Sequence, residues 1–288
     1  MNYIEHALAL ARCGRGKVAD HPLVGAVLVA DDEIVGEGWY EYDRIDHAET
    51  IALAQAGDRA RGATLYVTLE PCAHHGRTPP CADAVIAAGV VRVVIGALDP
   101  NPKAAGGLER MRAAGIEVEV LRPLVTLKLA VTLDGCVTVP GRRWVTGEAS
   151  RRRVHELRAT SDVVAVGMGT VRADDPQLDA RDVGATNQPR RIAFGHGETT
   201  LELRSGPLAD ELHALAGEGV RSLLLEGGPT IAQAFLEAGL VDQLLLFIAP
   251  VIAGEGQRAF GNVEVELRGM RAERVGDDVL LSGYVQLA

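Results

Sequence analysis

One histidine and two cysteines in the first third of the chain have the residue types and spacing of a zinc site. His47 is followed two residues later by Glu49. Cys72 and Cys81 are separated by the eight residues 73–80. One imidazole and two thiolates hold Zn²⁺ and leave the fourth position open for water, which is the arrangement of a catalytic zinc site. Zinc lowers the pKa of its bound water and so supplies hydroxide, while Glu49 would carry a proton to a leaving amine.

Helix starts are expected to position these four residues. Residues 47–56 predict a helix with His47 and Glu49 in its first turn. Pro71-Cys72 and Pro80-Cys81 are each expected to begin a helix, because proline is tolerated at the first helical position. Unpaired N–H groups at a helix start stabilise a thiolate, so Cys72 would be a ligand at neutral pH.

The remainder of the first half alternates between helical and strand-like patterns. Helices are expected at residues 3–12, 81–88 and 108–114, and strands at 23–30, 33–38, 64–68, 91–96 and 116–120. Asp31-Asp32 is the turn of a hairpin between the first two strands. This order of elements predicts a three-layer α/β domain.

The pattern of the zinc site resembles that of the zinc nucleobase deaminases, in which the glutamate after the histidine is not a ligand. More specifically, the first half is similar to the deaminase half of the bifunctional riboflavin biosynthesis deaminase/reductases. The motifs that carry this resemblance are His47-Ala48-Glu49, residues 71–81 with their long loop between the cysteines, and Asp99-Pro100-Asn101-Pro102. The resemblance implies a cytidine-deaminase-like domain over residues 1–122, with His47, Cys72 and Cys81 as zinc ligands and Glu49 as the catalytic residue.

A second α/β pattern follows the expected domain boundary at Arg122-Pro123. Strands are expected at residues 125–130, 162–167, 190–194, 220–225 and 244–251, with closing antiparallel strands within 263–287. Helices are expected at 147–159, 207–216 and 231–238. Thr146 is the expected N-cap of the first of these helices. Gly227-Gly228 comes directly before the last helix, where free backbone N–H groups can bind phosphate.

The second half, residues 123–288, looks like the reductase half of the same family, which is similar to dihydrofolate reductase. The motifs that carry this resemblance, in chain order, are residues 126–130, 133–135, 144–147, 169–171, 173–176 and 226–230. The resemblance implies that NADPH contacts Ala130, Trp144, Thr170, Asp174, Gly228, Pro229, Thr230, Ile231, Ala232, Gln233 and Ala234. It implies that substrate contacts Arg158, Leu178, Arg181 and Glu226, and the two arginines suit a sugar phosphate because a guanidinium bonds phosphate in a bidentate way.

The chain departs from the family pattern at several positions. His21 occupies the place of an asparagine that resembles a substrate contact, and Arg142 occupies the place of a serine. The loop after Asn101-Pro102 lacks a lysine, and whether the nearby Lys103 replaces it stays open. His74 and His75 are equally compatible with a substrate contact and with solvent exposure.

The segment between Phe194 and Leu223 is several dozen residues shorter than the family pattern, so at least one strand–helix unit is expected to be missing. The reductase domain is therefore expected to be a shortened one. Two outcomes stay open for it: a trimmed domain that is active, or a scaffold that has lost its cofactor.

Composition narrows the class of partner. The chain has 288 residues, a formal net charge of -10 and a sequence pI near 5.3, which argue against a nucleic-acid partner.

The N-terminus lacks a signal-peptide pattern and no apolar run is long enough to span a bilayer, so a cytoplasmic protein is expected. Cys13 and Cys136 are expected to be ordinary buried residues. The oligomeric state is not fixed by the sequence, and a homo-oligomer stays open.

The sequence therefore predicts a bifunctional riboflavin biosynthesis enzyme that uses Zn²⁺ and NADPH on a small pyrimidine ribosyl phosphate. It would first deaminate 2,5-diamino-6-ribosylamino-4(3H)-pyrimidinone 5′-phosphate and then reduce the ribosyl group to a ribityl chain. One alternative is a deaminase whose reductase domain has lost activity. Another is a binding module without enzymatic activity, against which the complete set of His47, Glu49, Cys72 and Cys81 argues.

Overall fold

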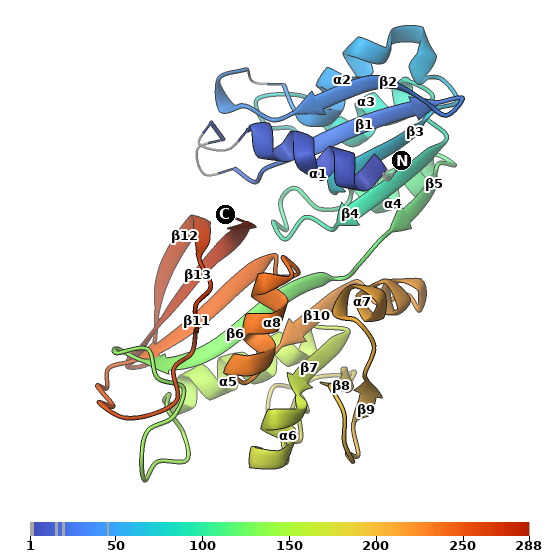
Figure 1. Ribbon diagram of the computed structural model, residues 1–288. Coiled ribbons are helices and arrows are strands. Elements are labelled where there is room, and N and C mark those ends of the chain that lie inside the picture. The colour runs from blue at the N-terminus through green and yellow to red at the C-terminus, as the bar shows by residue number, and fades with distance from the viewer. Residues whose placement is uncertain (1–2, 15–16, 19–20, 45, 288) are drawn as a thin grey trace. The chain divides into compact units, whose positions relative to one another are not determined.

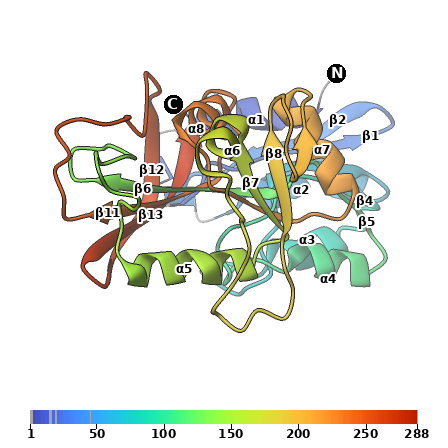
Figure 2. The same ribbon diagram turned by 90° about the horizontal axis from the view of Figure 1, so that it is seen from below.

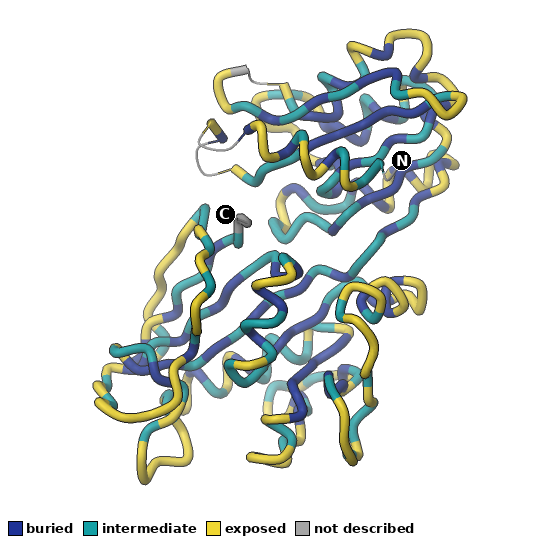
Figure 3. The backbone as a smooth tube through the Cα atoms, viewed as in Figure 1, coloured by how far each residue is buried: buried dark blue, intermediate teal, exposed yellow. Residues whose placement is uncertain are grey.

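The computed structural model describes residues 3–14, 17–18, 21–44 and 46–287. The chain divides into two compact units, Met1–Pro123 and Leu124–Ala288, and each has its own β-sheet and hydrophobic core. In both units the central strands of the sheet are mostly buried, whereas many of the connecting loops are exposed (Figure 3). Every helix of the described residues is too short or too polar to span a membrane.

The first unit is a five-stranded sheet between helices. Its elements in chain order are α1 (Tyr3–Cys13), β1 (Gly25–Ala30), β2 (Glu33–Trp39), α2 (Ala48–Ala56), β3 (Thr64–Leu69), α3 (Cys81–Ala87), β4 (Arg92–Ala97), α4 (Gly107–Ala113) and β5 (Glu117–Val120). The strand order is β2-β1-β3-β4-β5, with β1 antiparallel to both of its neighbours and β3, β4 and β5 parallel (Figure 1).

Alternating residues of the strands bury the two faces of this sheet against different helices. Ala26 and Leu28 of β1 pack with side chains of α2, α3 and α4, whereas Val27 and Val29 pack with Ala7 of α1. The domain therefore has the three layers expected from the sequence. Helix α2 approaches β2 so closely that a Cβ on Gly38 would lie 2.1 Å from the carbonyl oxygen of Ala48, which only glycine permits.

The second unit is an eight-stranded sheet with the order β12-β13-β11-β6-β10-β7-β8-β9. Its elements in chain order are β6 (Leu124–Thr132), α5 (Glu148–Ala159), β7 (Val163–Gly167), α6 (Met168–Asp174), β8 (Arg190–Phe194), β9 (Glu202–Arg204), α7 (Leu208–Gly217), β10 (Ser222–Leu225), α8 (Pro229–Glu237), β11 (Gln243–Ala249), β12 (Val265–Val275) and β13 (Asp278–Leu287). Six strands are parallel, and the β12–β13 hairpin joins them antiparallel to β11.

Helices cover both faces of the second sheet. Val163 and Ala165 of β7 belong to the cluster that includes α7 and α8. Val164 and Val166 of β7 belong to the cluster that includes Leu157 of α5, on the other face. Figure 2 shows α5 lying along one side of this sheet. The arrangement is the α/β domain that the sequence predicts, and its central parallel strands β7 and β10 are buried and almost continuously apolar.

Several local expectations were wrong. His47 is the N-cap of α2 and not part of its first turn. Cys72 does not begin a helix, because residues 70–80 after β3 are irregular, whereas Cys81 does begin α3. Gly147, and not Thr146, is the N-cap of α5. Cys13 is exposed, although Cys136 is buried as expected.

The shortened segment between Phe194 and Leu223 still contributes a strand and a helix. Strand β9 continues the parallel sheet beyond β8, and α7 follows it. Strand β9 and helix α6 have no counterpart among the elements expected from the sequence. Both are short: β9 has three residues and α6 has seven, which is too few for a periodic pattern to stand out.

Candidate active sites

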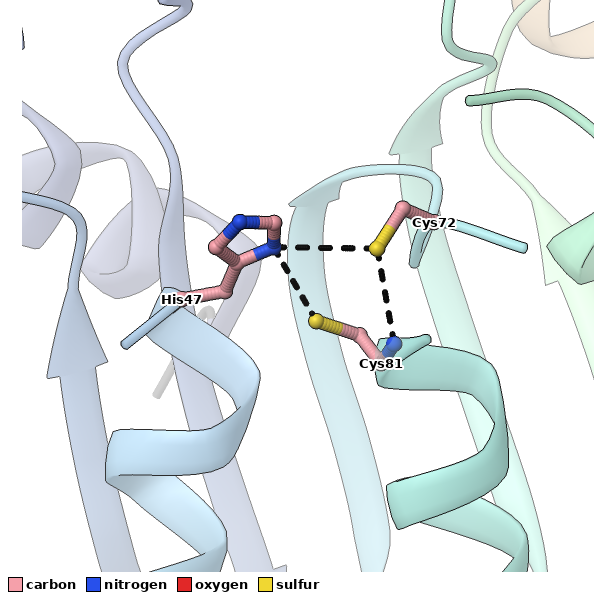
Figure 4. Close-up of side chains that lie close together, drawn as sticks. All are labelled: His47, Cys72 and Cys81. Atoms are coloured by element: carbon pink, nitrogen blue, oxygen red, sulfur yellow. Dashed lines mark hydrogen bonds between the residues drawn. The ribbon is translucent and has the colours of Figure 1, made fainter. Parts of the chain in front are cut away.

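Three side chains from three separate segments converge in the first unit. His47 caps α2, Cys81 begins α3, and Cys72 lies between β3 and α3. His47 Nδ1 is 3.7 Å from Cys72 Sγ and 3.2 Å from Cys81 Sγ (Figure 4). Ligand atoms of all three residues lie within 4.8 Å of one another. The structure thus brings together the three ligands that the sequence singles out.

The spacing of these atoms fits a tetrahedral zinc ion. With Zn–N and Zn–S bonds of about 2.1 and 2.3 Å, a tetrahedral angle separates the nitrogen from each sulfur by roughly 3.6 Å. The two observed separations, 3.7 and 3.2 Å, lie near this value. Three protein ligands leave one tetrahedral position for water or substrate, as catalytic zinc sites do.

Hydrogen bonds prepare the sulfur of Cys72 for metal binding. The Cys81 thiol, His47 and the backbone N–H of Cys81 (3.4 Å) stabilise the thiolate and, against the effect of burial, lower the pKa of Cys72 to about 4. The same bond to Cys72, together with burial, raises the pKa of the Cys81 thiol. The hydrogen bond to Cys72 also raises the pKa of His47, although burial opposes this. These contacts favour the thiolate form of Cys72, and a divalent cation would replace the proton of Cys81.

Glu49 lies beside this group in the first turn of α2 and is only 3% exposed. Burial raises the pKa of its carboxyl group to about 7, although the neighbouring His47 acts in the opposite direction. A carboxyl group with a pKa near neutrality both accepts and releases a proton readily. Glu49 is therefore suited to proton transfer next to the three candidate metal ligands.

The other candidate residues of the first unit lie on its surface. His74 and His75 are exposed in the loop between the two cysteines, and Lys103 is exposed as well. The ring of His21 is 5.4 Å from that of Tyr40, which in turn lies edge-on against His47 at 5.4 Å. Tyr40 is buried and packs against His47, and no sequence pattern other than its nearness to His47 singles it out.

In the second unit, the residues proposed to contact NADPH gather at the carboxyl ends of parallel strands. Ala130 of β6 lies beyond Leu225, the last residue of β10, which pairs with Leu127. Thr170 is in α6 directly after β7, and residues 228–234 begin α8 directly after β10. A Cβ on Gly228 would lie 3.0 Å from Thr170 Oγ1, so these two helix starts adjoin. Ligands of open α/β sheets bind at this edge of the sheet.

Two further residues of the proposed NADPH set differ in their surroundings. Asp174 is the last residue of α6 and is exposed. Trp144 lies in the loop before α5 with 53% of its surface exposed, so it is not a core residue. The guanidinium groups of Arg143 and Arg151 lie 5.1 and 5.5 Å from the centre of its ring.

Arg158 and Glu226, both proposed substrate contacts, bind each other. Arg158 donates from Nε at 2.5 Å and from Nη2 at 3.0 Å to the two oxygens of Glu226, and from Nη1 to the carbonyl oxygen of Asp179. Burial would raise the pKa of Glu226, but Lys128 and Arg158 outweigh it and lower the pKa. Each of the three guanidinium nitrogens thus has a protein acceptor, and this pairing fixes Arg158 and Glu226 relative to each other. The contact of Arg158 with substrate stays a prediction.

Lys128 is a candidate that sequence analysis missed. Its Nζ is 3.4 Å from Glu226 Oε2, and its side chain is only 15% exposed. The sequence does contain a sign of this residue, because Lys128 is a charged residue within an otherwise largely apolar strand. It lies two residues before Ala130, so both side chains face the same side of the sheet. A lysine within such a strand requires an anionic partner.

The loop after α6 carries the remaining substrate candidates. Leu178 is buried and has a φ of 53°, and Asp175 and Asp182 also have positive φ values. Arg181 is half-exposed and forms a 2.6 Å ion pair with Asp179. Strained backbone of this kind concentrates at ligand-binding segments.

Each of the two units matches a known protein family. The family model described as cytidine and deoxycytidylate deaminase zinc-binding region matches residues 1–97, and the RibD C-terminal domain matches residues 123–281. The chain is 37% identical to the riboflavin biosynthesis protein RibD of Aquifex aeolicus over 345 aligned positions, which cover 97% of each chain. It is 38% identical to RibD of Escherichia coli, with 89% of each covered.

A solved structure agrees with the sequence comparison. Acinetobacter baumannii RibD (form 2) matches with a TM-score of 0.53 and 32% identity, covering 99% of this chain and 98% of that one. The alignment with the Aquifex aeolicus protein is longer than the 288-residue chain, so that relative has segments that this chain lacks.

Proposed function

The chain belongs to the RibD family of riboflavin biosynthesis proteins, and on this premise we propose that it is a bifunctional deaminase and reductase that uses zinc and NADPH. The observation that carries the proposal is the convergence of His47, Cys72 and Cys81 beside the buried Glu49. The substrate is the 2,5-diamino-6-ribosylamino-pyrimidinone 5′-phosphate that the sequence resemblance implies.

In the deaminase site, His47, Cys72 and Cys81 would hold zinc. When bound, zinc makes water acidic enough to act as a nucleophile near neutral pH. Glu49 accepts the proton of the attacking water and later donates a proton to the leaving amino group. Water and the amino-pyrimidine thus yield a ring carbonyl and ammonia, and Glu49 returns to its starting protonation state.

In the reductase site, residues 228–234, Thr170 and Ala130 would hold NADPH at the carboxyl edge of the sheet. When bound, NADPH would supply a hydride to C1 of the ring-opened ribosylamine; the C=N bond takes up this hydride at carbon and a proton from solvent at nitrogen, which gives the ribitylamino chain. Lys128 and Arg158 hold Glu226 as a carboxylate that faces this edge, where it binds and orients the sugar. Leu178 and Arg181 contact the substrate from the strained loop after α6.

The deaminase assignment is tested with Glu49→Gln, which keeps the shape of the side chain but cannot carry the proton. We expect ammonia release to fall about 10²- to 10⁴-fold while zinc content is unchanged. Reduction of the already deaminated aminouracil ribosyl phosphate by the same variant serves as the control and should be unaffected. Unchanged ammonia release would refute the assignment.

The reductase assignment is tested by supplying purified protein with NADPH and the already deaminated substrate, which bypasses the zinc site. Oxidation of NADPH that saturates with substrate supports the bifunctional proposal. Ammonia release from the diamino substrate without any NADPH oxidation would instead favour a deaminase with an inactive second domain.

A further inference from the structure

A second buried carboxylate lies two residues before the zinc ligand Cys72. Glu70 is 5% exposed. Its Oε1 accepts hydrogen bonds from the backbone N–H groups of Gly106 (3.0 Å) and Leu108 (2.9 Å). Its Oε2 accepts one from the N–H of Asp99 (3.2 Å). The carboxylate therefore ties the end of β3 to both ends of the segment 99–108.

The same part of the chain also contacts the residues on either side of Cys72. A Cβ on Gly107 would lie 1.8 Å from the carbonyl oxygen of Pro71, so the two backbones touch. The N–H of Ala73 donates to the carbonyl oxygen of Ala104 at 2.9 Å. The guanidinium of Arg110 donates to the carbonyl oxygen of Ala73 at 3.2 Å.

On its other side, Cys72 is held by the start of α3. Its sulfur accepts the N–H of Cys81 at 3.4 Å, and its carbonyl oxygen accepts the N–H of Ala82 at 3.2 Å. Figure 4 shows the sulfur directed at both His47 and the backbone of Cys81. Because residues 70–80 have no regular structure of their own, these contacts fix where the sulfur of Cys72 lies.

Glu70 offers both of its oxygens to the backbone of the segment 99–108. A carboxylate presents acceptor sites on both of its oxygens, whereas an amide has only one oxygen. If the carboxylate were removed, three backbone N–H groups around it would lose their partner, and buried donors without partners are strongly unfavourable. The segment 99–108 would then have to separate from Pro71 to reach water.

We propose that Glu70 is a positioning residue for the zinc site and fixes Cys72 through the segment 99–108. The proposal rests on the zinc site of the proposed function. Groups that orient metal ligands without touching the metal change metal affinity about 10- to 100-fold when they are replaced. We therefore expect Glu70 to act on metal affinity and ligand geometry, and not only on folding.

The test compares wild-type protein with Glu70→Gln and Glu70→Ala, stripped of metal and titrated with zinc against a chromophoric chelator. The Co²⁺-loaded proteins are examined by visible absorption, which reports the thiolate ligands and their geometry. Val118→Ala is the matched control, because it removes buried volume from β5 of the same unit and Val118 belongs to a different buried cluster from Cys72.

We expect zinc affinity to fall about 10- to 100-fold in the glutamate variants, more for alanine than for glutamine, with an altered cobalt spectrum. Val118→Ala should bind zinc like the wild type. If Glu70→Ala does not fold, Glu70→Gln, which keeps one oxygen for Gly106 and Leu108, still decides the matter. Wild-type affinity and spectrum in Glu70→Gln, or an equal loss in Val118→Ala, would overturn the proposal. A wild-type protein that binds no zinc would instead overturn the proposed function.

Discussion

Two buried glutamates show how the surroundings of one residue type decide its chemistry. Burial raises the pKa of Glu49 to about 7, and its neighbour His47 only partly opposes the effect. Burial also acts on Glu226, but Lys128 and Arg158 outweigh it and lower the pKa. Glu49 is therefore suited to carry protons, whereas Glu226 is a fixed anion that can orient a neutral sugar.

Because Glu226 is paired with Lys128 and Arg158, we expect the free energy of unfolding to depend on its protonation and therefore on pH. An unperturbed glutamate, as in the unfolded chain, has a pKa of about 4.3. The pKa of Glu226 in the folded protein is lower. The stability that it contributes is therefore complete above about pH 4.3 and is lost as the pH falls through the lower folded pKa. At pH 7, Glu226→Gln should lower the free energy of unfolding by about 3 kcal/mol, because two buried cations lose their partner.

Urea denaturation of wild type and Glu226→Gln from pH 7 down to pH 3 measures this effect. The difference between the two proteins should be constant from pH 7 to about 5 and shrink below about pH 4.3. A difference that stays constant over the whole range would mean that the carboxylate is not stabilised by its neighbours.

At the scale of elements, helix starts place most of the functional groups. His47 caps α2 and Cys81 begins α3, so each of these two helices starts at a proposed zinc ligand. Helix α5, which carries Arg158, is held differently: Asp278 of β13 accepts the N–H of Gly147 at 2.8 Å and the hydroxyl of Ser150 at 2.6 Å. This carboxylate, 3% exposed, fills the role that the sequence assigned to Thr146.

The distant cap of α5 is tested by a matched pair of variants. Asp278→Ala removes both hydrogen bonds and should lower the free energy of unfolding by about 2 kcal/mol. Thr146→Ala, which removes the side chain expected to cap the helix, should change it by less than about 0.5 kcal/mol. Chemical denaturation of both variants gives the answer, and equal losses would show that Thr146 contributes to the cap after all.

At the scale of the whole molecule, the two units have separate sheets and separate hydrophobic cores. The proposed zinc ligands all belong to the first unit, and the proposed NADPH contacts all belong to the second. We therefore expect the two units to respond independently to their cofactors.

Calorimetry with and without a metal chelator tests this independence. A ligand stabilises only the unit whose folded form binds it, by about 2.7 kcal/mol at a hundred times its dissociation constant. Chelation should lower one unfolding transition by roughly 10 °C and leave the other in place. In His47→Ala, chelation should move neither transition. If both transitions of the wild type moved together, the units would be energetically coupled.

The sequence by itself determined the proposed set of zinc ligands and most of the order of elements, although it did not reveal α6 and β9. Motifs such as His47-Ala48-Glu49, and helical or alternating patterns, span only a few positions, so they can be interpreted from the local sequence. The resemblance to the riboflavin enzymes added both activities and the fold class. The assignment of individual residues to NADPH and to substrate remains a prediction from that resemblance.

Only the tertiary structure decided which distant groups meet. Asp278 caps a helix 131 positions away, and Lys128 meets Glu226 across 98 positions, because β6 and β10 are neighbours in the sheet. Glu70 likewise binds a segment that begins 29 positions later. No local pattern encodes such partners: a buried polar group must find a hydrogen-bond partner, but the packing of the sheet and its helices determines which partner is within reach.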